Sequence, residues 1–198
     1  MKVSLNLIRK YVDLPEGLTD EQIAYDMTLR TVEVEDVENT AKKFHDIVVG
    51  EILEIKAHPN ADKLRICMVD IGEEEPVQIV CGGSNLYVGE HVVVSKPGAE
   101  VVWHGQGEPV KITKTKMRGE SSYGMICAST EVYLSDFLPN EGEEEIVDLK
   151  GFDCKPGDSV ADLFGMNDTV LEIDNNSLSN RPDLWGHYVI ARELSAIY

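Results

Sequence analysis

The sequence predicts a mixed α+β protein in which a small closed β-barrel is inserted into a second, α/β domain that both ends of the chain build together. About six short apolar or alternating runs follow one another in the central part, which is typical of a small closed barrel. Each end carries helix and strand patterns but is too short to bury a core alone. Because insertions are tolerated where the host's chain ends lie close together, we expect residues 1–43 and 151–198 to form one α/β domain and residues 44–150 to form the barrel.

The N-terminal segment predicts two helices followed by a strand. Apolar residues from Leu5 to Val12 recur at helical spacing. A second helix is expected after Thr19, whose hydroxyl suits the N-cap position, with Gln22 at the third helical position of a capping box. Residues 32–37 alternate at a period of two, which predicts a strand.

Six segments in the centre are rich in β-branched and apolar residues and are separated by Gly, Pro and Asn, which favour turns. We therefore predict strands over residues 47–55, 64–71, 77–80, 91–95, 110–117 and 124–127. Three of the four cysteines stand in or beside these segments, and no two cysteines have the CxxC spacing of a zinc site. We expect buried, reduced thiols and no metal.

The C-terminal segment predicts a helical turn, a strand and a helix. Residues 159–164 fit the turn, and residues 169–174 alternate as a strand. Pro182 suits the first turn of the last helix, where its missing N–H does no harm. One face of that helix is expected to contain Leu184, Tyr188, Ala191, Ser195 and Tyr198, with Leu194 beside it.

The charge balance is strongly acidic. The chain has 18 basic and 36 acidic residues, a formal net charge of −18, and residues 45–150 alone hold nine basic and 19 acidic residues. A general nucleic-acid binder is expected to be basic, so the composition argues against one. No run reaches the ~18 apolar residues of a membrane span, and the start lacks an apolar signal core. We therefore expect a cytoplasmic protein with no membrane partner.

One segment departs from this acidic background. Lys111, Lys114, Lys116 and Arg118 place four positive charges in eight residues with no acid among them. Phosphates would feel this group within a Debye length of ~8–10 Å, whereas the acidic tract at residues 141–145 would repel them. Either charged run is also compatible with an ordinary solvated face. We interpret the basic segment as the place where the barrel meets a polyanion.

Three motifs in the centre are more specific. They are His58-Pro59-Asn60-Ala61-Asp62-Lys63-Leu64, Val80-Cys81-Gly82 before Asn85, and Met117-Arg118-Gly119-Glu120-Ser121-Ser122-Tyr123-Gly124-Met125-Ile126-Cys127. In this order they resemble the tRNA-binding OB-fold domain of several synthetase-associated proteins. The flanks add Glu33-Val34-Glu35, and Asn180-Arg181-Pro182-Asp183 followed by Ala191-Arg192-Glu193-Leu194. With these flanks, the whole chain resembles the N-terminal portion of the β subunits of bacterial phenylalanyl-tRNA synthetases (phenylalanine–tRNA ligases).

The resemblance implies a role within a larger enzyme. Such synthetases are heterotetramers of α and β subunits that carry out ATP- and Mg²⁺-dependent aminoacylation at a site in the α subunit. It implies that this chain is a non-catalytic part that contributes phenylalanine-specific tRNA binding and subunit architecture, takes no cofactor itself and has no DNA partner. The residues agree with a non-catalytic role, since the chain contains no GxxxxGK[ST] loop and no nucleophile within a recognisable motif.

The expected tRNA contacts lie on the barrel. OB-folds bind on the face of the second and third strands and in the flanking loops. Residues that alternate along a strand share a face, so the cations from Lys114 to Arg118 are expected to point one way. The predicted contacts are His58, Asn60, Lys63, Arg65, Lys114, Lys116, Arg118 and Ser122. For His58 and Asn60 a structured turn is the alternative, because Asn side chains readily bond nearby backbone.

Two other functions remain open at the level of sequence. The chain could be a stand-alone tRNA-binding or chaperone module of the OB type. It could also be a purely structural module for protein contacts, and the net acidity of residues 45–150 favours this alternative. Salt dependence separates the structural module from the RNA binders, because phosphate contacts weaken as salt rises.

Overall fold

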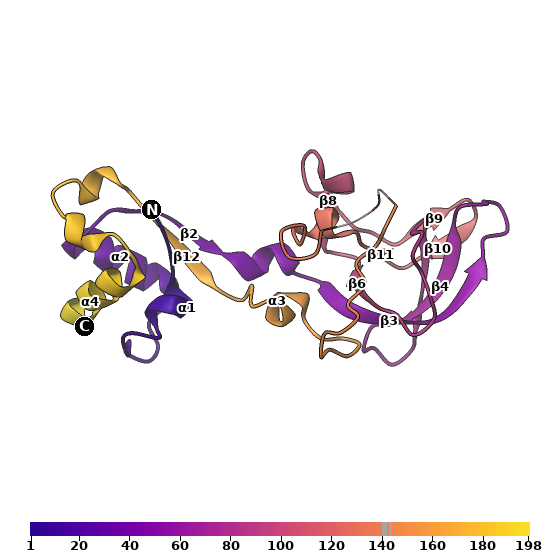
Figure 1. The fold of residues 1–198 in the computed structure, drawn as a ribbon, viewed down its shortest axis with the longest axis horizontal. Coiled ribbons are helices and arrows are strands. Elements are labelled where there is room, and N and C mark those ends of the chain that lie inside the picture. Colours follow the sequence, from indigo (N-terminus) through magenta and orange to yellow (C-terminus); the bar gives the residue numbers. More distant parts are fainter. Residues whose placement is uncertain (140–141, 143) are drawn as a thin grey trace. The chain divides into compact units, whose positions relative to one another are not determined.

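The computed structural model describes residues 1–139, 142 and 144–198 of the 198-residue chain. The chain forms two compact units (Figure 1). The first consists of Met1–Ala41 and Met166–Tyr198, and the second of Lys42–Gly165. The second boundary therefore follows Gly165, whereas the sequence pattern places it after residue 150.

Residues 151–165 belong to the second unit because their backbone binds strand β3 (Ile47–Ala57). The Val49 N–H donates to the Asp158 carbonyl, and the Gly157 N–H donates to the Val49 carbonyl, both at 2.9 Å. The spacing of apolar residues in the sequence does not predict this kind of backbone pairing. A short helix, α3 (Val160–Leu163), follows directly.

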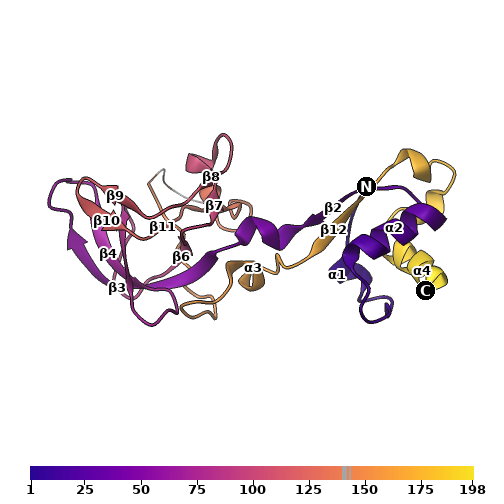
Figure 2. The same cartoon turned by 180° about the vertical axis from the view of Figure 1, so that it is seen from behind.

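The first unit is built around a three-stranded antiparallel sheet with the order β1-β12-β2. Figure 2 labels β12 and β2, which run side by side. The strands are β1 (Lys2–Ser4), β12 (Thr169–Ile173) and β2 (Val34–Asn39). The central strand comes from the C-terminal segment, and both neighbours come from the N-terminal segment. Neither end of the chain can form this sheet alone.

Three helices cover the apolar side chains of this unit: α1 (Leu5–Ile8), α2 (Asp20–Arg30) and α4 (His187–Ile197). The predicted cap of α2 is confirmed, because the Thr19 hydroxyl accepts a hydrogen bond from the Gln22 N–H at 3.1 Å. None of the helices in the described part of the chain has the length and apolar content needed to cross a bilayer. The shared core is formed mainly by Leu5, Ile8, Met27, Leu171, Ile190 and Leu194.

The last helix begins later than the sequence predicts, and it buries Ile190, Ala191 and Leu194. Residues 182–184 form a separate 3₁₀ turn, and Gly186 follows with a positive φ of 135°. Tyr188 is 65% exposed and Ser195 is also exposed, whereas Leu194 is buried. The prediction of one helical face that includes Leu184 is wrong, because Leu184 belongs to the separate 3₁₀ turn and α4 begins only after Gly186.

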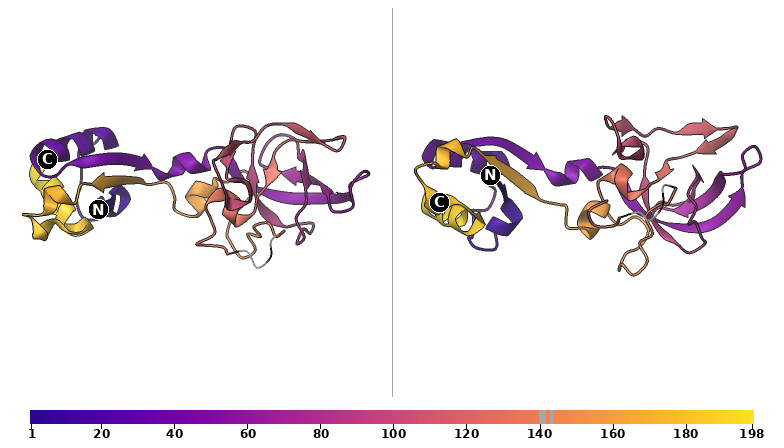
Figure 3. Two further views of the ribbon diagram at one scale, coloured as in Figure 1. Left: turned by 90° about the horizontal axis from the view of Figure 1, so that it is seen from above. Right: turned by 45° about the horizontal axis from the view of Figure 1, so that its top comes forward.

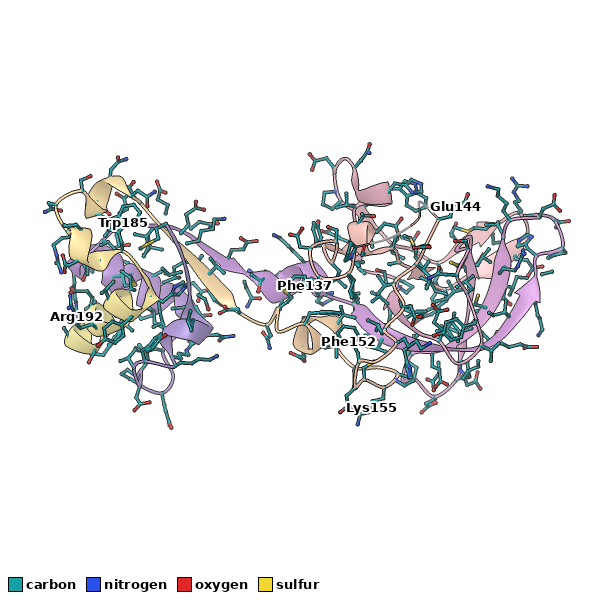
Figure 4. The ribbon with its side chains drawn as sticks, viewed as in Figure 1. Phe137, Glu144, Phe152, Lys155, Trp185 and Arg192 are labelled. Atoms are coloured by element: carbon teal, nitrogen blue, oxygen red, sulfur yellow. The ribbon has the colours of Figure 1, made fainter. Side chains whose placement is uncertain are left out.

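An ion-pair network ties the 3₁₀ turn to α4. Arg181 donates two hydrogen bonds to the Asp183 carboxylate, from Nε at 3.0 Å and from Nη2 at 2.9 Å. Its Nη2 also donates to Glu193 at 3.0 Å, and Arg192, labelled in Figure 4, donates to Asp183 at 3.2 Å. Arg181 is thus held by two carboxylates, and Gly186 takes the N-cap position of α4.

The second unit contains a five-stranded antiparallel sheet that curls into a nearly closed barrel, so the predicted OB-type barrel is confirmed (Figure 3). The strand order is β11-β6-β3-β4-β5. Besides β3, the strands are β4 (Arg65–Asp70), β5 (Val77–Cys81), β6 (His91–Ser95) and β11 (Met125–Ile126). The interior is filled by Ile52, Cys67, Val69, Ile79, Val92 and Val94.

The prediction of one strand over residues 110–117 is wrong, because two short strands lie there in separate two-stranded sheets. The pairs are β7 (Glu100–Val101) with β8 (Val110–Lys111), and β9 (Thr115–Met117) with β10 (Glu120–Ser122). Between β8 and β9 the chain turns inward at Ile112, which is buried. Its N–H donates to the Ala99 carbonyl at 2.8 Å, and its carbonyl accepts from the Gly98 N–H at 2.9 Å.

The cysteines Cys67, Cys81 and Cys127 are buried and carry free thiols, which confirms the prediction of reduced, buried cysteine. Burial raises the pKa of the Cys67 thiol to about 12 and that of the Cys81 thiol to about 11. These side chains therefore remain neutral and behave as small apolar residues of the barrel interior.

Glu90 is a fully buried carboxyl group just before β6. Its Oε2 accepts a hydrogen bond from the Tyr87 N–H at 3.1 Å, while Oε1 has no partner among the described residues. Burial, aided by the nearby Asp148 charge, raises the pKa of Glu90 from its ordinary value of 4.5 to about 7. Because the unfolded chain restores the ordinary pKa, the folded barrel binds this proton more tightly than the unfolded chain does.

We predict that the barrel loses stability as pH rises through the interval between these two pKa values. The contribution of Glu90 is fully present below about pH 4.5 and is lost as pH approaches 7. Glu90→Gln, which stays neutral, should be more stable than the parent by about 1–3 kcal/mol at about pH 8, and the difference should vanish near pH 4. Urea unfolding at several pH values measures this difference. Glu100→Gln, at an exposed position of β7, is the matched control. If the free energy of unfolding of both variants, relative to the parent, changed equally with pH, the raised pKa of Glu90 would be contradicted.

Candidate nucleic-acid interface

The β9–β10 hairpin is the element that carries the basic motif. Its strands are joined by the two-residue turn Arg118–Gly119, and both residues have positive φ, 49° and 103°. Positive φ at both central positions is the geometry of the tight turn that matches strand twist, and glycine adopts it without strain. The hairpin lies beside β5, outside the five-stranded barrel sheet.

The turn after β3 docks onto the tip of this hairpin. His58 is 5% exposed, and its Nδ1 accepts a hydrogen bond from the Asn60 N–H at 3.1 Å. Its Nε2 therefore carries the proton and donates to the Met117 carbonyl at 3.0 Å. The Asn60 side-chain amide donates to the Arg118 carbonyl at 3.1 Å, and Arg118 Nη1 donates back to the Asn60 carbonyl at 3.4 Å. Two motifs that are far apart in the sequence thus form one surface.

The base of the hairpin is attached to β5 by Ser122 and Gln78. Ser122 is 1% exposed, and its Oγ accepts from the Val80 N–H at 3.0 Å and donates to the Gly124 carbonyl at 2.9 Å. The Gln78 side chain donates to the Ser121 carbonyl at 2.8 Å. With its hydroxyl engaged on both sides, Ser122 holds the hairpin against the barrel.

Three of the predicted cations project from this hairpin into solvent. Lys114, Lys116 and Arg118 are all exposed. None of them forms an ion pair with a carboxylate in the part of the chain that the structure describes. The Lys114 ammonium lies 4.4 Å from the centroid of the Tyr123 ring. Their charge is therefore available to an anion.

Lys63 and Arg65 lie near the hairpin's supporting loop but are already engaged. Lys63 Nζ donates to Glu144 Oε1 at 2.8 Å, and this bond raises the pKa of Lys63. Glu144, labelled in Figure 4, belongs to the acidic tract at residues 141–145. Residues 141 and 143 of that tract lie outside the described residues. Arg65 Nη1 donates to the Asp62 and Leu64 carbonyls at 2.9 and 3.0 Å.

A hollow of about 400 Å³ opens between β5 and the hairpin. Val77 and Gln78 line it from β5, and Lys116 and Tyr123 are among the residues that line it from the other side. A second hollow of about 640 Å³ is lined by the acidic turn 73–75 and also reaches Val77. The hollow beside the lysines therefore has the acidic turn on one side, and the Glu120 carboxylate of the hairpin accepts from Gln78 Nε2, one of its lining groups, at 3.5 Å.

Sequence reasoning did not select Gln78 or Tyr123 as site residues. The signal for Gln78 was present, because it is the polar position between the apolar Val77 and Ile79 of a strand and so faces away from the core. Tyr123 stands inside the third motif, but its position beside Lys114 depends on how the hairpin folds back on β5.

Comparison with known proteins identifies a family for the second unit. Residues 47–158 match the model of a family described as putative tRNA binding domain. The whole chain is 37% identical to the phenylalanine–tRNA ligase β subunits of Halalkalibacterium halodurans and Staphylococcus epidermidis, and 38% identical to that of Latilactobacillus sakei. All of the chain is covered in each case, but only 24%, 24% and 23% of the relatives. The chain thus spans about a quarter of the length of the curated relatives it matches.

We predict that Ser122→Ala destabilises the second unit by about 1–3 kcal/mol, because it leaves a buried N–H and a buried carbonyl without their partner. Ser121→Ala changes an exposed hydroxyl of the same strand and should cost less than about 0.5 kcal/mol. Chemical denaturation of the two variants measures the difference. Equal stabilities would show that Ser122 does not hold the hairpin.

Proposed function

Because the chain belongs to the family of putative tRNA-binding domains, we propose that it binds tRNA through the β9–β10 hairpin and the turn docked on it. One observation carries the proposal: three exposed cations that have no carboxylate partner among the described residues stand on, or directly before, a hairpin that buried hydrogen bonds fix to the barrel. Phosphate contacts dominate the affinity of such surfaces. Lys114, Lys116 and Arg118 are the proposed phosphate contacts.

The remaining predicted site residues divide by what their side chains already bind. We assign His58, Asn60 and Ser122 a positioning role, because their polar atoms hold the hairpin. Lys63 and Arg65 are proposed as peripheral contacts. For Lys63 to reach a phosphate, its ion pair with Glu144 has to be exchanged, which reduces the net gain.

At the level of the whole protein, we propose that the chain works as a non-catalytic part of a phenylalanine–tRNA ligase β subunit. This rests on full-length similarity to curated proteins of that name. It would contribute binding of phenylalanine-specific tRNA and subunit architecture to a cytoplasmic α/β heterotetramer. We place ATP- and Mg²⁺-dependent aminoacylation elsewhere in that enzyme, as the family resemblance implies.

Binding through this surface is expected to be modest in affinity and sensitive to salt. Three phosphate contacts give a slope of log K against log salt of roughly −2 to −3. The excess of acidic over basic residues in 45–150 opposes a long-range attraction, but screening limits its reach to ~8–10 Å. The contact is therefore local to the hairpin.

We predict that charge reversal of Lys114 and Lys116 together weakens tRNA binding at least ~tenfold and flattens the salt slope by about two. Fluorescence anisotropy with labelled tRNA at several salt concentrations measures both quantities. Lys150→Glu combined with Lys155→Glu, at two exposed lysines of the same unit, is the matched control for the same change of net charge. Unchanged affinity of the variant at Lys114 and Lys116 would remove the hairpin as the site, and undetectable binding of the parent chain at low salt would favour a purely structural module.

A further inference from the structure

The hollow between β5 and the hairpin has features that phosphate binding alone does not use. Its lining combines the apolar Val77, the aromatic Tyr123 and the polar Gln78 with two lysines, Lys114 and Lys116. Its volume of about 400 Å³ lies within the range of sites that hold small organic groups. A cation contact needs no such recess.

We propose that this hollow receives one unpaired base of the bound RNA, which stacks on Tyr123 while Lys114 and Lys116 contact the flanking phosphates. The proposal rests on the proposed function and names the part of the RNA that the site recognises. A nucleotide joins a flat π-system to an anion, and the site offers an aromatic ring and ammonium groups side by side. Bases of a duplex are stacked inside the helix, so only an unpaired base can enter.

Lys114 occupies the position that the base would take. Its ammonium lies 4.4 Å from the Tyr123 ring centroid, a cation–π contact at an exposed site. Stacking of a base on an aromatic side chain is the stronger of the two contacts. When a base stacks on the Tyr123 ring, it displaces the Lys114 ammonium from the ring. The ammonium then contacts a phosphate of the same RNA.

The neighbouring acidic turn gives the bound strand a direction. Glu73, Glu74 and Glu75 line the second hollow, which meets the first at Val77. Phosphates are repelled on that side. On the hairpin side the two charges of Lys116 and Arg118 outweigh the single carboxylate of Glu120, whose Oε2 lies 3.5 Å from Gln78 Nε2. The backbone of the RNA is therefore expected to leave the hollow toward Lys116 and Arg118.

Binding of two RNA probes to the 198-residue chain tests this proposal: a single-stranded oligoadenylate of about ten nucleotides and a duplex of equal length, alongside intact tRNA. Tyr123→Leu should weaken binding of the single strand by about tenfold and leave the salt slope unchanged, because it removes stacking and no phosphate contact. Tyr123→Phe keeps the ring and should bind like the parent. Lys116→Gln should reduce the salt slope by about one.

A spectroscopic readout on the parent chain does not depend on how the variants fold. The fluorescence of oligoadenylate that carries 2-aminopurine should change on binding, because the base leaves the stack of its neighbouring adenines and stacks on Tyr123. Unchanged fluorescence, binding of Tyr123→Leu within about twofold of the parent, or equal affinity for the duplex would overturn the base pocket. If tRNA still binds with a steep salt slope in those cases, the proposed function stands; if the parent chain does not bind tRNA at low salt, both fail.

Discussion

The position of the β9–β10 hairpin depends on hydrogen bonds made by two buried polar side chains, His58 and Ser122. A two-stranded hairpin is only marginally stable in water by itself, and this one does not belong to the barrel sheet. His58 fixes its tip through the Met117 carbonyl, and Ser122 fixes its base through the Val80 N–H. Because both side chains are buried, these bonds face no competition from water, and the exposed lysines between them are carried on a defined backbone.

The same arrangement explains how an acidic chain can present a site for a polyanion. The cations of the hairpin have no carboxylate partners among the described residues, whereas Lys63, on the supporting loop, is paired with Glu144. Screening confines the rest of the negative charge to short distances. The site therefore acts through close contact and not through the field of the whole domain. The hollow beside the lysines is consistent with binding by close contact, since stacking of a base adds affinity that salt does not weaken.

Much of the fold could be predicted from local patterns in the sequence. Strand alternation located the barrel, and the Thr19 cap and the buried cysteines follow from residue type and spacing alone. The motifs around His58 and Arg118 also stand out in the sequence. Their contact in space could not be predicted, because the hydrogen bond from His58 to Met117 joins residues 59 positions apart. No periodicity encodes such a contact.

The errors have the same origin. Residues 110–117 look like one strand, but the buried Ile112 divides them in two. The last helix looks continuous from Pro182, but Gly186 interrupts it. Glu90 and Tyr123 carry no sequence signal of their role, since burial of the first and the ring contact of the second arise only when distant strands pack together.

Hydrogen–deuterium exchange of the 198-residue chain with and without tRNA tests the central claim most directly. The account predicts slower amide exchange in the turn around His58 and Asn60 and in residues 114–123, with exchange in the first compact unit unchanged. Protection confined to the first unit, with none on the hairpin, would contradict the claim that the docked hairpin is the RNA-binding surface.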